Sequence, residues 1–190
     1  MNSIDQTTIN TEIGYIYNIN TDGHLVNNLS KQDMQTKWLN AVNGVVSLCE
    51  GFFKDNLHSI YIRGSIAEGH AYDNRSDIDL MIVLNDQVAV KKGQLRALLE
   101  AQITNFRSSV DEYLKDKHPY VTYVDYSPII LIDKLLNDDS DNSAVHRFLI
   151  KYQSVHVYGI NIQDSLKHTE REDIPMYHSS LGITMNQIRT

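Results

Sequence analysis

Cysteine is nearly absent from this chain, which has a single one, Cys49, among its 190 residues. One cysteine excludes a disulfide within the chain. Cys49 lies on the apolar stripe of an expected helix, where a buried and inert thiol is a better interpretation than a nucleophile. A fold held together by internal disulfides is therefore excluded.

Basic residues are outnumbered: 17 lysines and arginines face 24 aspartates and glutamates, and the net charge is −7. This balance disfavours nucleic acid as a partner, because proteins that grip a phosphate backbone normally carry basic stripes. Long apolar runs are also missing, since none approaches the roughly 20 residues that span a bilayer. Residues 1–11 lack the apolar centre of a signal peptide. We expect a cytoplasmic protein without a membrane segment.

The chain is long enough for one well-filled core. Residues 1–29 are polar apart from 14–17 and Leu25-Val26, and Asp22-Gly23 between these runs predicts a β-hairpin. Residues 30–160 are expected to form the main domain, and 161–190 a tail with one further helix at most.

The first long helix is predicted over residues 31–55. Ser30 is its expected N-cap, and Asp33 stands where a capping-box acid would be. Apolar residues then recur at steps of three and four, which gives the helix one apolar face: Met34, Trp38, Ala41, Val42, Val45, Cys49, Phe52 and Phe53.

Alternating helical and extended patterns follow along the chain. Strands are predicted at 59–63, 77–84, 121–126 and 154–158. Helices are predicted after Gly64-Ser65, after Asn85-Asp86, from Pro128, and from a cap at Asn142-Ser143. This order predicts an α/β or α+β fold, with a small mixed sheet flanked by helices.

Two aspartates open the second strand, in the sequence Ser76-Asp77-Ile78-Asp79-Leu80. Side chains alternate along a strand, so Asp77 and Asp79 share a face while Ile78 and Leu80 point into the core. Two neighbouring carboxylates repel each other unless a cation lies between them. Oxygen-only ligands favour Mg²⁺, which commonly binds together with a phosphate. The Gly64-Ser65 turn is placed to hold that phosphate through its backbone N–H groups and hydroxyl.

These residues resemble the signature of the DNA polymerase β-like nucleotidyltransferase superfamily, especially its minimal and aminoglycoside-modifying members. The resemblance covers residues 59–126, and 128–159 more loosely, through Gly64, Ser65, Ala67, Gly69 and the run 76–80. It implies transfer of a nucleoside monophosphate from a nucleoside triphosphate to a hydroxyl, with release of pyrophosphate. It also implies that Asp77 and Asp79 bind metal and that Gly64 and Ser65 hold the triphosphate. Ser76 is counted with this nucleotide-binding group, although bracing the carboxylate turn is its alternative role.

Such a site needs a third carboxylate, and Asp125 is the only acid within the third predicted strand. In two-metal phosphoryl transfer one ion activates the attacking oxygen and the other stabilises the leaving pyrophosphate. Asp125 would bind the first ion or take the acceptor's proton. The alternative is that Asp125 is a strand-end aspartate that starts a turn. A register slip of one residue would turn its side chain to the opposite face of the sheet, away from Asp77 and Asp79.

Two arginines and one histidine near the motif have more than one interpretation. Arg63 and Arg75 could each contact phosphate or pair with a nearby acid such as Asp73. His70 is not counted as a ligand, because Mg²⁺ sites rarely use imidazole.

The sequence thus predicts a Mg²⁺-dependent nucleotidyltransferase that modifies a small molecule or a protein, with ATP or another nucleoside triphosphate as donor. The alternative is a nucleotide-binding regulator, or an antitoxin-like partner of a second protein, with little catalysis. RNA tailing is disfavoured by the acidic balance. The acceptor, the donor base and the oligomeric state stay open, and a homodimer that shares the acceptor pocket is one of several arrangements left open.

Overall fold

The computed structural model of this chain describes residues 18–85, 94–126 and 128–168, with backbone alone over 94–102. Its helices are α1 (Thr36–Phe53), α2 (Gly64–Ala67), α3 (Gln94–Lys117), α4 (Ile132–Asn137) and α5 (Asp141–Gln153). Its strands are β1 (Asn18–Ile19), β2 (Leu25–Val26), β3 (Leu57–Arg63), β4 (Ile78–Leu84), β5 (Val124–Asp125), β6 (Ile129–Leu131) and β7 (Ser154–Gly159). Single 3₁₀ turns follow α1 and β7.

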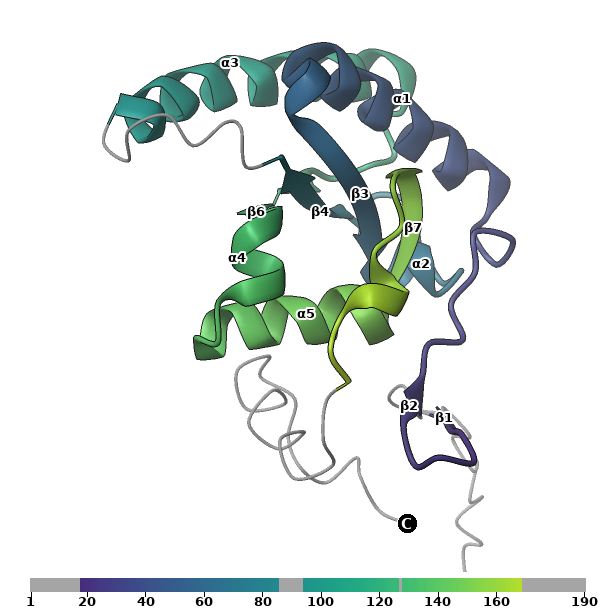
Figure 1. Ribbon diagram of the computed structural model, residues 1–190. Helices are drawn as coiled ribbons and strands as arrows, with labels where there is room; N and C mark the ends of the chain where they lie inside the picture. Colours follow the sequence, from purple (N-terminus) through teal and green to yellow (C-terminus); the bar gives the residue numbers. More distant parts are fainter. Residues whose placement is uncertain (1–17, 86–93, 127, 169–190) are drawn as a thin grey trace, which may run out of the picture.

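A mixed five-stranded sheet forms the centre of the molecule (Figure 1). The strand order is β5-β4-β3-β7, and β6 also pairs with β4. Strand β3 is antiparallel to β4 and β7, whereas β4 is parallel to β5 and β6. Helices α1 and α3 cover one face, while α4 and α5 cover the other. The predicted fold class, a small mixed sheet flanked by helices, is confirmed.

The two faces of the sheet pack into separate apolar clusters because side chains alternate along each strand. Ile78 and Leu80 of β4 join the larger cluster with α1 and α3, as predicted. Met81 and Val83 join the smaller cluster with α4 and α5. Asp79 therefore stands on the α4 and α5 side of the sheet.

Helix α1 begins later than predicted, at Thr36 instead of residue 31. Ser30 and Asp33 do bond to each other, since the Ser30 amide donates to Asp33 Oδ2 at 3.1 Å and the Asp33 amide to the Ser30 carbonyl at 3.0 Å. These bonds close a single turn before the helix and do not cap it. The predicted apolar face is correct: Trp38 and Cys49 are fully buried.

The sequence predicts a helix from Pro128, and this prediction is wrong. The residues after it form β6, whose register places Ile129 opposite Ile82 of β4. The Ile82 amide donates to the Pro128 carbonyl at 3.0 Å, so pairing with β4 decides the conformation. The helix begins at Ile132 instead.

The other element boundaries differ by less. The third predicted strand is limited to Val124–Asp125. Helix α5 is capped by Ser140, whose side chain accepts from the Ser143 amide, two residues before the expected cap. The expected cap of α3 lies partly outside the described residues, since 86–93 are not among them.

The predicted N-terminal hairpin is present, formed by β1 and β2 around Gly23 with φ of +85°. Residues 14–17 lie outside the described residues, and so do residues 169–190 of the tail, for which the sequence predicts one further helix at most. Among the helices that are described, none is both long enough and apolar enough to cross a membrane.

Candidate active site

The site residues lie where three strand ends meet. Strand β3 ends at Arg63, and β4 begins immediately after Asp77. Because β3 runs antiparallel to β4 while β4 and β5 run parallel, the end of β3 and the starts of β4 and β5 share one edge of the sheet. The sheet topology therefore brings Asp77, Asp79 and Asp125 to the same place.

Strand register aligns three charged side chains in one row. Asp79 is the Cα partner of Arg63 on one side and of Asp125 on the other. The Arg63 Nη2 atom is 3.1 Å from Asp79 Oδ1 and 3.6 Å from Asp125 Oδ2. Asp125 thus lies on the same face as Asp79, in the position that the sequence required of a third carboxylate. Arg63 pairs with these two acids and not with Asp73, whose carboxylate contacts Lys37.

Asp79 is more enclosed than Asp125, since their side chains are 15% and 36% exposed. The pKa of Asp79 is raised from 3.8 to about 6: burial is the largest cause, the neighbouring Arg63 guanidinium acts against it, and the charges of Asp77 and Asp125 add to the rise. Burial therefore outweighs the ion pair, although the arginine is only 3.1 Å away. Asp79 is ionised at neutral pH at a cost that an additional cation would reduce.

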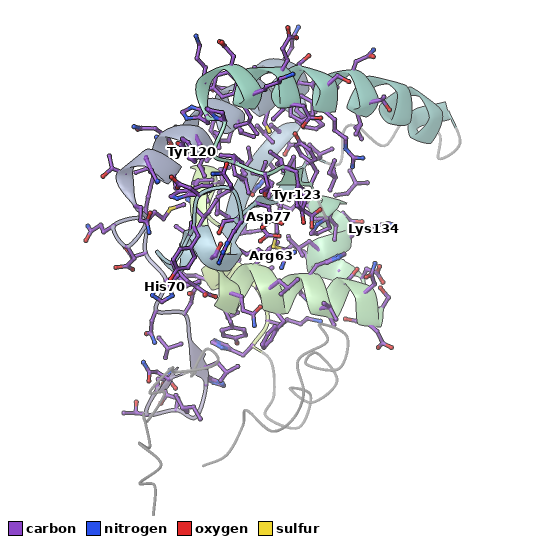
Figure 2. All side chains as sticks on the ribbon, turned by 180° about the vertical axis from the view of Figure 1, so that it is seen from behind. Arg63, His70, Asp77, Tyr120, Tyr123 and Lys134 are labelled. Carbon is purple, nitrogen blue, oxygen red and sulfur yellow. The ribbon has the colours of Figure 1, made fainter. Side chains whose placement is uncertain are left out.

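Tyr123 also belongs to this cluster of side chains, although the sequence motif does not include it. Its hydroxyl is hydrogen-bonded to Asp77, and this bond together with the charge of Asp77 raises the pKa of the phenol. Figure 2 shows Arg63, Asp77 and Tyr123 gathered between α3 and α5, with His70 and Lys134 to either side. The signal was present in the sequence, because Tyr123 precedes Asp125 by two residues and so shares its face of the strand.

Gly64 is pressed against the carboxylate of Asp79. Its φ is +70°, in the left-handed region that favours glycine, and a β-carbon at this position would lie 2.3 Å from Asp79 Oδ2. Position 64 therefore requires glycine for two reasons: its backbone has a positive φ, and a β-carbon would collide with the Asp79 carboxylate. The predicted Gly64-Ser65 turn lies beside the carboxylates, as a phosphate-holding turn would.

Ser76 joins three segments of the site. Its hydroxyl accepts from Ser65 Oγ and from the Tyr72 amide, both at 3.0 Å. Its carbonyl accepts from the Thr122 hydroxyl at 2.7 Å and from the Thr122 amide at 3.2 Å. With 7% exposure and these bonds, Ser76 braces the turn before Asp77, which is the alternative role that the sequence left open.

No family model, no curated protein and no solved structure matches this chain. The likeness to nucleotidyltransferases therefore rests on the motif residues alone. A function has to be inferred from the chemistry of the site itself.

The donor set suits a hard divalent cation, because all three acids offer carboxylate oxygens. The guanidinium of Arg63 contacts both Asp79 and Asp125, which shows that these two carboxylates together attract a cation. Within the described part of the chain, no group of three or more histidine, cysteine, aspartate or glutamate side chains is already arranged around a metal position. The oxygen ligands that these residues offer are of the kind that Mg²⁺ prefers.

Proposed function

We propose that this chain is a Mg²⁺-dependent nucleotidyltransferase. It would transfer a nucleoside monophosphate, from ATP or another nucleoside triphosphate, to a hydroxyl of a small molecule or protein. The observation that carries this proposal is the meeting of Asp77, Asp79 and Asp125 beside the glycine turn at position 64. A structural role alone gives no reason to gather three carboxylates at one sheet edge, because their mutual repulsion costs stability.

The reaction is an in-line displacement at the α-phosphorus. The acceptor oxygen forms a bond to this phosphorus, the bond to the bridging α,β-oxygen breaks, and pyrophosphate leaves with the electron pair. Asp125 is suited to take the acceptor's proton, because its side chain is 36% exposed where that of Asp79 is 15% exposed. Mg²⁺ bound by Asp77, Asp79 and Asp125 would supply the positive charge that stabilises the attacking oxygen and the pyrophosphate.

The donor's triphosphate is expected against the turn that follows β3. Gly64 has no β-carbon, and the place that one would occupy lies against the Asp79 carboxylate. Ser65 lies next to it, although its hydroxyl donates to Ser76. Backbone N–H groups of the turn are therefore the better phosphate donors in this proposal.

A nucleotide-binding regulator with little catalysis is the second candidate. The pairing of Arg63 with both Asp79 and Asp125 favours it, because a protein cation already offsets part of the negative charge. Such a protein would bind nucleotide, or a second protein, without releasing pyrophosphate.

Calorimetric titration with ATP in the presence of Mg²⁺ tests nucleotide binding. We expect Mg²⁺-dependent binding to the wild type and its loss in the double variant Asp77→Ala/Asp79→Ala. The matched control is Asp139→Ala, which removes a carboxylate that is 81% exposed and pairs with Lys167 outside the site. Absence of Mg²⁺-dependent binding to the wild type would contradict the proposed transferase and any regulator that acts by binding nucleotide.

Pyrophosphate release separates the two candidates. The protein is incubated with Mg²⁺, ATP and mixtures of hydroxyl compounds, and release is compared with that of the Asp77→Ala/Asp79→Ala variant. Release above this background supports transfer. Nucleotide binding without release, together with stable co-purification of a second protein, would favour the regulator.

A further inference from the structure

The guanidinium of Arg63 occupies the point between two carboxylates of the proposed metal site. A single nitrogen, Nη2, makes both contacts, at 3.1 Å to Asp79 and 3.6 Å to Asp125. The strand register places the three residues in one row across β3, β4 and β5, with Asp79 next to Arg63 on one side and to Asp125 on the other. The arginine thus takes the place where a cation would balance these two acids.

This placement leaves the arginine incompletely bonded. Its Nε atom is buried and has no hydrogen-bond partner among the described residues. Arg147 offers a contrast, because its buried guanidinium donates to the carbonyls of Leu135 at 3.1 Å and Asp138 at 2.7 Å. An unsatisfied buried donor costs free energy, so Arg63 is held less well than an arginine with a purely structural role.

We propose that Arg63 is an exchangeable counter-cation, which a divalent metal ion displaces from Asp79 and Asp125. The displaced guanidinium then binds a phosphate of the donor nucleotide, because the turn expected to hold the triphosphate starts at the next residue, Gly64. Guanidinium groups suit this exchange, since they bind carboxylate and phosphate with the same forked geometry. This inference rests on the metal and nucleotide binding of the proposed function.

Competition of this kind couples the two ligands. Metal alone has to displace the arginine without compensation, so it binds weakly. Nucleotide offers the guanidinium a new partner, so it increases the affinity for metal, and metal increases the affinity for nucleotide by the same factor. Arg63 is therefore a positioning residue that makes metal binding depend on nucleotide.

Titration with Mn²⁺, followed by its electron paramagnetic resonance signal, tests the exchange without any assay of activity. We compare the wild type, Arg63→Gln and Arg75→Gln, with and without ATP. Arg75 is the matched control because it is exposed and lies two residues before Asp77. In the absence of ATP we expect Arg63→Gln to bind Mn²⁺ about tenfold more tightly than the wild type. Arg75→Gln should differ little. ATP should increase Mn²⁺ affinity strongly in the wild type and less in Arg63→Gln.

Equal or weaker Mn²⁺ affinity in folded Arg63→Gln would overturn the exchange, and continued binding of Mg²⁺ with ATP would leave the proposed function standing. Failure of every protein to bind Mn²⁺, with or without ATP, would overturn both. Circular dichroism checks folding. If Arg63→Gln does not fold, Arg63→Lys takes its place. Its expected Mn²⁺ affinity is higher than that of the wild type and lower than that of a protein with no charge at position 63. A lysine variant that binds Mn²⁺ no better than the wild type would then overturn the exchange.

Discussion

The α-carbon of Gly64 lies so close to the carboxylate of Asp79 that a β-carbon would come within 2.3 Å of Oδ2. The two residues belong to different segments, the turn after β3 and the second position of β4. Any side chain at position 64 would push the Asp79 carboxylate away from its present position, and hence alter its contact with Arg63.

Gly64→Ala should destabilise the protein more than Gly23→Ala. Both glycines have positive φ, but nothing lies within 4 Å of a β-carbon at Gly23. We expect Gly23→Ala to cost at most about 1–2 kcal/mol from backbone strain, and Gly64→Ala at least about 1 kcal/mol more because Asp79 must move. Urea unfolding measures both. The additional cost of Gly64→Ala over Gly23→Ala should be smaller when both are made in an Asp79→Ala background. An unchanged additional cost would contradict the contact between Gly64 and Asp79.

Asp79→Asn should stabilise the metal-free protein at neutral pH but not at acid pH. The pKa of Asp79 is raised from 3.8 to about 6 in the folded state. The unfolded chain therefore releases this proton first, and the contribution of Asp79 to stability falls as the pH rises from about 4 to about 6. We expect the variant to equal the wild type below pH 4 and to exceed it by up to about 3 kcal/mol at pH 7.

Urea unfolding at several pH values, with a chelator present, measures this difference. The control is Asp139→Asn, whose carboxylate is 81% exposed. A difference between Asp79→Asn and wild type that stays constant from pH 4 to pH 7 would show that Asp79 titrates as an ordinary carboxylate.

The residues of the site were largely predictable, whereas their mutual contacts were not. Alternation along a strand sufficed to place Asp77 and Asp79 on one face. The position of Asp125 next to Asp79 could not be derived in the same way. It depends on the parallel pairing of β5 with β4, which is set by tertiary structure and not by local sequence. The bridging position of Arg63 depends on two strand registers at once, which no local pattern encodes.

The fold shows the same division between local and long-range information. Helical periodicity located the buried face of α1, but Ser30 and Asp33 make bonds that suit a single turn as well as a helix start. Pro128 suits the first turn of a helix, yet the segment after it pairs with β4 and becomes β6. In both cases short-range chemistry permitted two outcomes and packing selected one.

Asp77→Asn should lower the pKa of the Tyr123 phenol toward its ordinary value. The pKa is raised because Tyr123 is hydrogen-bonded to Asp77 and because a phenolate would be repelled by this carboxylate. Ultraviolet difference spectra of the wild type and of Tyr123→Phe, recorded with rising pH, isolate this tyrosine. The same comparison in the Asp77→Asn background should show ionisation at lower pH. An unchanged titration would remove Tyr123 from the site.

Two glycines of α1 should respond to alanine in opposite directions. A β-carbon at Gly44 would lie 2.5 Å from Tyr113 Cζ of α3, and this ring is anchored by a 3.1 Å hydrogen bond to His118. Gly51 has nothing within 4 Å. Thermal unfolding should show Gly44→Ala destabilised by about 1–3 kcal/mol and Gly51→Ala stabilised by about 0.5–1 kcal/mol from helix propensity. A stabilised Gly44→Ala would mean that α1 and α3 pack more loosely.

The hydrogen bonds of Ser76 determine which segments of the site unfold together. Its hydroxyl and carbonyl hold Ser65, Tyr72 and Thr122, which belong to the ends of separate stretches of chain. Loss of this residue's bonds would release the turn after β3, the start of β4 and the approach to β5 together. These segments should therefore exchange their amide hydrogens as one cooperative unit, so that the carboxylates are either all in register or all dispersed.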